Sequence, residues 1–330
     1  MHSFLVTGGS GFIGTHFIEE LLRNGRSVLN IDIKPPKIDA HRPFWREVDI
    51  LDEALLVKTF NELRPTHVVH LAARTDTDGT CLADYEANTT GTQNVLSAIK
   101  RNDSIERVII TSSQFVNQYR GTPATDLDFA PHTIYGESKV ITEKLTRSAE
   151  LQCVWTIIRP TNIWGAWHPR YPHEFWRILG KGLYVHPGGK KVVRAYGYVG
   201  NVVFQMNRIL EAAEPQVSGK VFYVGDQPLD LLDWVNAFSR AQRGSEVRVV
   251  PAAALRALAR VGDALKRFRL TFPITSSRYE SMTTSNEISM SPTFNALGTP
   301  PYSLEDGVLE TVEWLRRHHP GLVSVRAKEG

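Results

Sequence analysis

The sequence predicts an α/β fold, with a doubly wound parallel sheet covered by helices on both faces and a smaller, partly helical C-terminal lobe. Short apolar runs alternate with amphipathic helical segments throughout the first half, a pattern typical of parallel sheets. After Gly165 the alternation becomes irregular, and aromatic, proline and glycine residues cluster up to Gly189. The chain has 330 residues, which is long enough for a large core and two lobes.

The expected elements follow in order along the chain. Apolar runs predict strands at residues 3–7, 27–31, 67–71, 107–112, 152–158 and 220–224. Helical spacing of apolar residues predicts helices at residues 12–23, 53–63, 83–100 and 135–150. We therefore expect a sheet domain at 1–165, joined by roughly 196–226, and a substrate-binding lobe at 166–195 and 227–330.

Composition narrows the class of protein. The net charge of +3 comes without any block of lysine or arginine, so nucleic-acid binding has little support. The two cysteines, Cys81 and Cys153, lack metal-ligand spacing, and we expect neither a disulfide framework nor a metal site. No signal peptide and no apolar run of about 18 residues is seen, so a cytoplasmic protein without membrane spans is expected.

Three glycines lie between the first strand and the first helix. Gly8 allows a tight turn, Gly11 lets the backbone approach a pyrophosphate, and Gly14 lets the helix pack closely on the strand. The N-terminus of the helix then offers N–H groups to phosphate. A glycine-rich turn without a ligand is the alternative, but the strand–turn–helix context favours a Rossmann dinucleotide site.

Asp32 supports that interpretation, because it ends the second strand. A carboxylate at this place can accept both ribose hydroxyls of the adenosine half, and it would repel a 2′-phosphate. NAD is therefore expected rather than NADP, although Lys34 could partly offset the repulsion. A mononucleotide phosphate loop is not expected, since no Gly-Lys-Ser or Gly-Lys-Thr follows the glycines.

Tyr135 and Lys139 lie four residues apart and share one face of an expected helix. A nearby ammonium stabilises a phenolate and lowers the pKa of tyrosine from its usual value near 10. The tyrosine can then take a hydroxyl proton as hydride leaves, or return it to a carbonyl. Taken alone, this spacing is common on helix surfaces.

A hydroxyl group at the end of the preceding strand gives the pair a partner. Thr111, Ser112 and Ser113 end that strand at the carboxyl edge of the sheet, where ligands bind in such folds. A serine there can bond the reacting oxygen and orient it. The alternative is a loop serine that bonds only backbone, and the residues alone do not choose between Ser112 and Ser113.

Taken together, these motifs resemble the extended short-chain dehydrogenase/reductase family, also called NAD-dependent epimerases and dehydratases. The resemblance covers nearly the whole chain. Besides the glycines, Asp32, the serines and the Tyr-Lys pair, it rests on Asp49-Ile50, His70-Leu71-Ala72-Ala73, Asn88-x-x-Gly91-Thr92 and Arg159-Pro160-x-Asn162-x-x-Gly165.

The resemblance implies roles for individual residues. It makes Ser113, Tyr135 and Lys139 the catalytic set, with Ser113 chosen by lining up Phe115-Val116 with the family pattern. It also implies NAD as the cofactor and a homodimer. The implied cofactor-binding residues are Gly8, Gly11, Phe12, Ile13, Gly14, Asp32, Asp49, Ile50, Leu71, Ala72, Ala73, Asn88, Tyr135, Lys139 and Pro160.

The sequence departs from the family at two places. Gln114-Phe115 stands where dehydratases of the group carry Asp-Glu, which counts against a sugar 4,6-dehydratase because neither residue exchanges a proton. Gly200-Asn201 stands where the family has Asp-Asp after Tyr-Val.

Three readings of the function remain. By resemblance, Asn162, Arg194 and Arg278 would bind the diphosphate of a nucleotide sugar, and guanidinium groups suit phosphate well. This favours a nucleoside-diphosphate-sugar 4-epimerase or 4-ketoreductase. The alternatives are a hydroxysteroid- or dihydroflavonol-type alcohol dehydrogenase and, third, a non-catalytic NAD-binding regulator. For Arg278 an ordinary surface position is an equal alternative.

Overall fold

The computed structural model describes residues 2–117, 123–267 and 274–322. The chain divides into two compact units. The first comprises residues 1–163, 197–226 and 289–301, and the second comprises 164–196, 227–288 and 302–330. The stretch 289–301, which the sequence analysis placed in the second lobe, therefore belongs to the first unit.

The first unit is built on a seven-stranded sheet in the order β11-β6-β5-β4-β1-β2-β3. Every pairing in it is parallel. Its strands are β1 (Ser3–Thr7), β2 (Ser27–Asp32), β3 (Trp45–Glu47), β4 (His67–His70), β5 (Arg107–Thr111), β6 (Val154–Pro160) and β11 (Lys220–Val224). The strand order reverses between β1 and β4, and in such sheets the ligand-binding crevice lies at that reversal.

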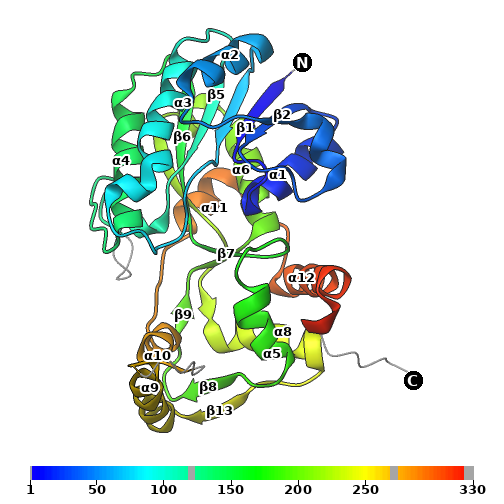
Figure 1. Cartoon of the computed structure of the whole chain (residues 1–330), viewed down its shortest axis with the longest axis vertical. Coiled ribbons are helices and arrows are strands. Elements are labelled where there is room, and N and C mark those ends of the chain that lie inside the picture. Colours follow the sequence, from blue (N-terminus) through cyan, green and yellow to red (C-terminus); the bar gives the residue numbers. More distant parts are fainter. Residues whose placement is uncertain (1, 118–122, 268–273, 323–330) are drawn as a thin grey trace. The chain divides into compact units, whose positions relative to one another are not determined.

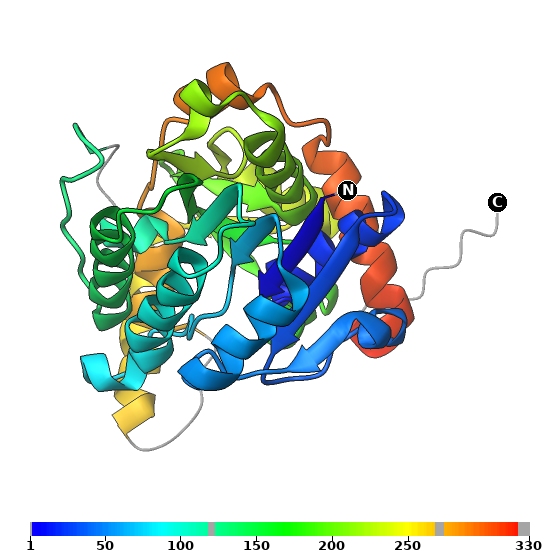
Figure 2. The same ribbon diagram turned by 90° about the horizontal axis from the view of Figure 1, so that it is seen from above.

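Helices cover the sheet, so that its apolar strands are shielded from water. Helix α1 (Phe12–Arg23) lies beside α6 (Val199–Glu211), while α2 (Glu53–Leu63), α3 (Thr90–Lys100) and α4 (Ile134–Ser148) lie side by side (Figures 1 and 2). The main core joins buried residues of the sheet to residues of α2 and α3, among them Leu5, Val68, Phe60 and Val95. Full burial of each such side chain contributes about 1.5–3 kcal/mol.

The single helix expected at 83–100 is wrong, because the structure divides it. A 3-10 segment, η2 (Leu82–Asn88), precedes α3, and Thr89 between them has φ −107° and ψ −80°. The Asn88 side chain accepts a hydrogen bond from the N–H of Arg74 and donates one to the carbonyl of Arg74. The helical pattern of apolar residues continues across this break, which is why the sequence alone predicted one helix.

Several elements of the first unit have no counterpart in the sequence analysis. They are the edge strand β3, the long helix α6, and the shorter segments η1 (Asp39–Phe44), η3 (Gln114–Val116), α7 (Glu214–Val217) and α11 (Ser291–Leu297). Helix α6 follows directly on the short strand β10 (Tyr196–Tyr198), which brings the chain back to the sheet, and β7 (Asn162–Trp164) takes it away.

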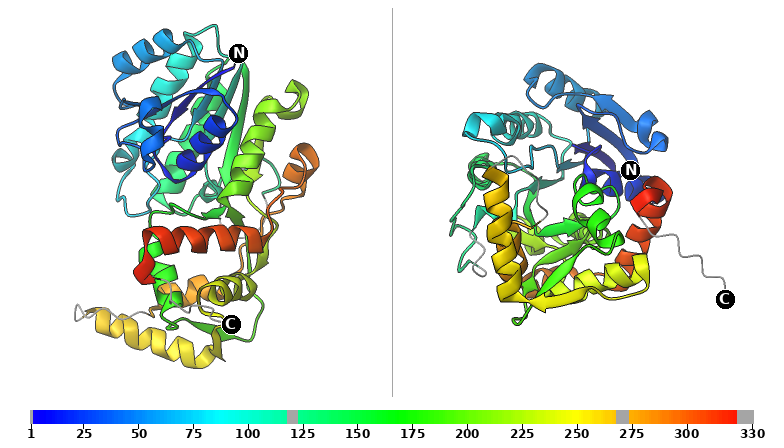
Figure 3. Two further views of the ribbon diagram at one scale, coloured as in Figure 1. Left: turned by 90° about the vertical axis from the view of Figure 1, so that its right-hand side faces the viewer. Right: turned by 60° about the horizontal axis from the view of Figure 1, so that its bottom comes forward.

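The second unit is mostly helical and has an aromatic core. Trp176, Trp234 and Phe238 are almost fully buried, and their rings lie 5.0–5.7 Å from one another where they meet. Helices α9 (Ala252–Arg267) and α12 (Leu304–His318) can be followed in Figure 3 as the long yellow and red ribbons. Among the described residues, no helix is long and apolar enough to cross a membrane. The elements are η4 (Pro172–Trp176), α5 (Arg177–Gly180), β8 (Val185–Gly188), β9 (Val193–Arg194), β12 (Leu229–Asp230), α8 (Leu231–Arg243), β13 (Arg248–Pro251), α9 (Ala252–Arg267), α10 (Ser276–Thr283), α12 (Leu304–His318) and η5 (Pro320–Leu322).

Candidate active site

The glycine turn after β1 has the geometry that its sequence predicts. Gly8 has φ +72°, and a Cβ there would lie 2.5 Å from the amide nitrogen of Ala72. A Cβ on Gly14 would lie 2.4 Å from the carbonyl oxygen of Gly8. Only glycine fits these two places, so the turn keeps β1, β4 and α1 in close contact.

The start of α1 is suited to a phosphate group. Gly11 is its N-cap residue and has no side chain to satisfy the first N–H groups. The 12-residue helix therefore presents both its N–H groups and the positive end of its dipole beyond β1. These features, together with the room that the absent Cβ atoms leave, fit the pyrophosphate of a dinucleotide.

Asp32 lies at the end of β2 beside this turn. Its two carboxylate oxygens accept hydrogen bonds from the backbone N–H groups of Ser10, at 3.1 Å, and Lys34, at 2.9 Å. Burial raises the pKa of Asp32, against the lowering effect of those bonds and of the charges on Lys34 and Lys37. Lys37 is therefore a second cation near the carboxylate, besides the expected Lys34.

His70, the last residue of β4, connects the end of β1 to helix α3. Its ring lies 2.7 Å from the Thr7 hydroxyl and 3.1 Å from the Thr92 hydroxyl. Burial, and the nearby charge of Lys139, lower the pKa of His70 to about 3, so the ring is neutral. The Thr7 hydroxyl also accepts from the N–H of Ala72, which anchors the expected cofactor-lining segment of Leu71, Ala72 and Ala73 to β1.

Asn88 links the loop that follows β4 to helix α4. Its carboxamide oxygen accepts from the N–H of Arg74 at 2.8 Å, and its amide nitrogen donates to the Arg74 carbonyl and to the Ser138 hydroxyl at 2.9 Å. Ser138 directly precedes Lys139 on α4. The Asn88 side chain therefore joins η2 to the loop at Arg74 and to helix α4, and these bonds occupy its polar atoms.

Tyr135 lies in the first turn of α4, where the Thr133 hydroxyl caps the helix by accepting from the N–H of Gly136. Its ring is buried and contacts the rings of Tyr85 and Phe115, with centroids 6.0 and 5.7 Å away. Gly136 permits this approach, since a Cβ there would lie 2.3 Å from the Phe115 carbonyl oxygen. The turn that begins at Ser113 and the start of α4 are therefore in direct contact.

Lys139 lies one helical turn after Tyr135 and is only 2% exposed. Its ammonium donates to the carbonyl of Thr111, at the end of β5, over 2.9 Å. Burial lowers the pKa of Lys139 to about 8, and the negative charge of Glu143 opposes that shift. A buried lysine with its ammonium held in place can stabilise the negative charge of a nearby phenolate.

The two serines at the end of β5 have different surroundings. The Ser112 hydroxyl donates to a carboxylate oxygen of buried Glu143 at 2.6 Å. The Ser113 hydroxyl oxygen accepts from the N–H of Phe115 at 3.2 Å as the cap of η3, which leaves its proton for another acceptor. The geometry thus favours Ser113 as the serine that could meet a reacting oxygen.

Other expected residues of this unit lie near the same strand ends or farther along the sheet. Asn162 follows β6, and its carboxamide oxygen accepts from the Gln114 side chain at 2.9 Å. Pro160 is the last residue of β6. Ile50 is buried against Gly91 of α3, whereas Asp49 is exposed and accepts from the N–H of Leu51.

Arg194 and Arg278 both belong to the second unit. The Arg194 side chain is 8% exposed and donates to the carbonyl of Ser281 on α10. Its Nε is buried and has no hydrogen-bond partner among the described residues. Arg278 lies on the same helix, three residues before Ser281, and is exposed. The structure therefore brings both predicted arginines to α10.

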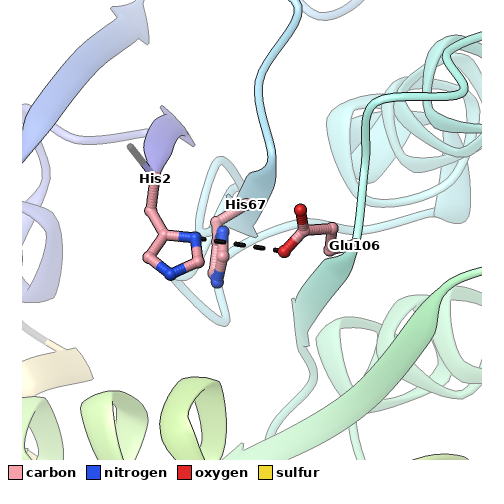
Figure 4. A group of neighbouring side chains, drawn as sticks. All are labelled: His2, His67 and Glu106. Carbon is pink, nitrogen blue, oxygen red and sulfur yellow. Dashed lines mark ion pairs between the residues drawn. The ribbon is translucent and has the colours of Figure 1, made fainter.

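A separate group of side chains lies at the opposite edge of the sheet. One nitrogen each of His2 and His67 and a carboxylate oxygen of Glu106 all lie within 4.8 Å of one another (Figure 4). Two of the three residues are exposed, and His67 is buried. They come from the starts of β1, β4 and β5, whereas the expected catalytic residues follow the strand ends. This group is therefore no part of the candidate active site, and its residues are too far apart in sequence to form a recognisable motif.

Known proteins resemble this chain in both sequence and fold. A 3-beta-hydroxysteroid dehydrogenase of Mycolicibacterium neoaurum is 27% identical over 248 residues, which cover 70% of this chain and 67% of that protein. An Escherichia coli O157:H7 enzyme, N-acetyl-alpha-D-glucosaminyl-diphospho-ditrans,octacis-undecaprenol 4-epimerase, is 28% identical over 208 residues, or 60% of each chain. The chain thus spans less than two thirds of the second protein.

A solved structure extends the likeness to the whole fold. The UDP-glucuronic acid 4-epimerase of Bacillus cereus, solved with UDP-glucuronic acid and NAD, has a TM-score of 0.72 and 20% identity, with 96% of this chain and 99% of that chain covered. At this identity the likeness concerns the fold alone. The sequence profile of the NAD dependent epimerase/dehydratase family matches residues 4–225. That stretch holds the glycine turn, the Ser-Tyr-Lys set and most of the sheet, and the chain belongs to the NAD dependent epimerase/dehydratase family.

Proposed function

We propose that this protein uses NAD to act on a nucleoside-diphosphate sugar, by 4-epimerisation or by reduction of a 4-keto group, with Tyr135 as the acid/base. The buried pair on α4 carries the acid/base part of this proposal, and the buried Nε of Arg194, which has no partner among the described residues, favours the nucleotide sugar. Tyr135 packs against the turn that begins at Ser113, and Lys139 is bonded to the end of the same strand. No acidic residue stands at position 114, where a dehydratase would need one.

The cofactor would be bound by residues at the carboxyl ends of β1, β2 and β4. The glycine turn and the start of α1 would bind the pyrophosphate, and Asp32 the adenosine ribose. Leu71 to Ala73 would line one side of the cofactor, and Pro160 would lie along its nicotinamide half. NAD, when bound, supplies the acceptor and donor of hydride.

Tyr135 would take the proton of the substrate hydroxyl as its carbon is oxidised, and would return it when the carbonyl is reduced. The Lys139 ammonium favours the phenolate of Tyr135, because a positive charge one helical turn away stabilises the negative form. Its bond to the Thr111 carbonyl fixes the place of that charge. The hydroxyl of Ser113 would donate to the same substrate oxygen and orient it.

Within the second unit, Arg194 and Arg278 would bind the diphosphate of the substrate. Arg194 has a buried Nε without a partner among the described residues, and a phosphate oxygen would satisfy it. Asn162 has its oxygen bonded to Gln114, which leaves its amide nitrogen as the donor for an anion. Arg278 is exposed and would make the weaker contact.

A specific observation favours a second candidate, an alcohol dehydrogenase for an apolar substrate. The Mycolicibacterium neoaurum relative is a 3-beta-hydroxysteroid dehydrogenase. In addition, Arg194 already donates to the Ser281 carbonyl and is nearly buried, as a structural arginine would be. The Ser-Tyr-Lys set would serve both chemistries, so the substrate must be decided by binding.

The deciding experiment compares two ligand panels on the purified protein saturated with NAD. UDP-, GDP- and dTDP-sugars form one panel, and 3β-hydroxysteroids and dihydroflavonols the other. We expect a thermal shift and turnover with a nucleotide sugar, and loss of turnover in Tyr135→Phe. A shift with a steroid alone would favour the second candidate. NAD binding without turnover on either panel would favour a regulator. The homodimer stays a prediction, which light scattering can check.

A further inference from the structure

Glu143 lies at the centre of a buried network beneath the catalytic residues. Its side chain is fully buried and follows Lys139 by one helical turn on α4. One of its oxygens accepts from the Ser112 hydroxyl at 2.6 Å and from Nε of Arg159 at 2.8 Å. The other oxygen accepts from Nη2 of Arg159 at 2.9 Å. Arg159 therefore binds the carboxylate through two parallel bonds, the strongest form of this pair.

The Arg159 guanidinium connects Glu143 to further segments. Nη2 also donates to the carbonyl of Asp126 at 2.7 Å, and Nη1 to the Tyr223 hydroxyl at 3.3 Å. The network thus joins the end of β5, helix α4, strand β6, strand β11 and the segment that leads into α4. Of these elements, α4 carries Tyr135 and Lys139, and β5 ends two residues before Ser113.

Stability alone does not account for this arrangement. A buried ion pair loses about as much free energy by desolvation as it gains by attraction, and well-packed apolar residues often replace it without loss. What an apolar contact cannot supply is a directional bond to the Ser112 hydroxyl. Because Ser112 and Ser113 are adjacent, fixing one side chain fixes the backbone that carries the other.

We propose that Glu143 and Arg159 are positioning residues, which act through Ser112 to hold Ser113 at a fixed place relative to Tyr135 and Lys139. The proposal rests on the function proposed above. It assigns a role to Ser112, which stands beside the catalytic serine but donates its proton inward. Glu143 lies on the same face of α4 as Tyr135 and Lys139, at successive spacings of four residues.

The first test is a double-mutant cycle on the two serines. Ser112→Ala should lower kcat about tenfold or more, as the loss of a bond to a charged group does, and leave KM and NAD affinity nearly unchanged. In a Ser113→Ala background, Ser112→Ala should lower kcat no further, because the residue through which it acts is gone. If Ser112→Ala lowers kcat by the same factor with and without Ser113→Ala, the proposal is overturned.

A matched control separates positioning from general loss of packing. Thr156 on β6 is buried, and its hydroxyl donates to the Val217 carbonyl at 2.8 Å, away from the catalytic residues. Thr156→Val removes a buried hydroxyl with little change in shape, and its kcat should stay near that of the unaltered protein. A loss of kcat equal to that of Ser112→Ala would show a merely structural effect.

A second measurement needs no substrate. Amide hydrogen exchange of residues 112–117 and 126–133 should accelerate in Glu143→Gln and in Ser112→Ala, and stay unchanged in Thr156→Val. Unchanged exchange in the first two variants would refute the positioning role. Tyr135→Phe gives the separate check on function: if it retains turnover, the proposed function fails, while the exchange result still decides for or against the network.

Discussion

The ammonium of Lys139 is bonded to the backbone carbonyl of Thr111 at 2.9 Å, which ties helix α4 to the end of β5. The lysine therefore has a fixed position before any ligand binds. Its charge lies one helical turn from Tyr135, the residue proposed to exchange the proton. Tyr135 and Lys139 should act as one unit.

That relationship predicts non-additive losses. Tyr135→Phe removes the exchanging hydroxyl and Lys139→Met removes the charge, so each should lower turnover by roughly 10²–10⁴-fold. The double variant should lose far less than the product of the two. Steady-state kinetics on the substrate found by the ligand panels measures the turnover of the single and double variants. Ser113→Ala should lower turnover less than Tyr135→Phe does. Near-normal turnover by folded Tyr135→Phe protein would exclude the mechanism.

The burial of Lys139 also predicts a pH dependence of stability. Its pKa is about 8 in the folded protein, whereas a lysine in an unfolded chain has a pKa near 10.4. Below pH 8 both states bind the proton, and the cost of burial is constant. Between these values the unfolded chain binds more protons, so the free energy of unfolding rises with pH, by at most about 1.4 kcal/mol per pH unit.

Urea unfolding from pH 7.5 to 10.5 measures this effect. The unaltered protein should gain stability relative to Lys139→Met as pH rises through the window, since methionine has no proton to lose. If the free energy of unfolding changes with pH in the same way for both proteins, Lys139 titrates normally and is less buried than the structure shows.

Asp32 predicts the choice of cofactor. Its carboxylate is fixed by the N–H groups of Ser10 and Lys34, at the place where a 2′-phosphate would be repelled. We expect tighter binding of NAD than of NADP, and Asp32→Asn should reduce that preference by about tenfold or more. Fluorescence titration with both dinucleotides measures it. Lys34→Ala and Lys37→Ala are the matched controls. Equal affinities of the unaltered protein for NAD and NADP would contradict the prediction.

Arg194 gives the sharpest test of the substrate. If it binds a diphosphate, Arg194→Ala should weaken nucleotide-sugar binding by about 1.5–3 kcal/mol and leave NAD affinity unchanged. Arg194→Lys should recover only part of this, because an ammonium cannot bind phosphate through two parallel bonds. Calorimetric titration gives the affinities and thermal melting the stability. A fall in melting temperature without a change in affinity would make Arg194 structural.

The parts of the site that depend on local sequence could be predicted. The turn at Gly8 and the strand end at Asp32 follow from adjacent residues. A backbone with positive φ favours glycine, and a short run of apolar residues favours a buried strand. The link from Glu143 to Ser112 and Arg159 could not be predicted in this way, since it joins residues brought together only by the sheet. The break at Thr89 likewise adjoins Asn88, which bonds the distant backbone of Arg74.

The order of the strands has a consequence for how the chain folds during synthesis. The sheet of the first unit is completed by β11, which is made about sixty residues after its partner β6. Until residues 220–224 leave the ribosome, β6 is the edge strand of the sheet in place of β11, and an unprotected apolar edge strand can pair with another chain. A fragment ending at residue 163 should therefore aggregate, whereas a chain that keeps the later stretches 197–226 and 289–301 retains the whole unit.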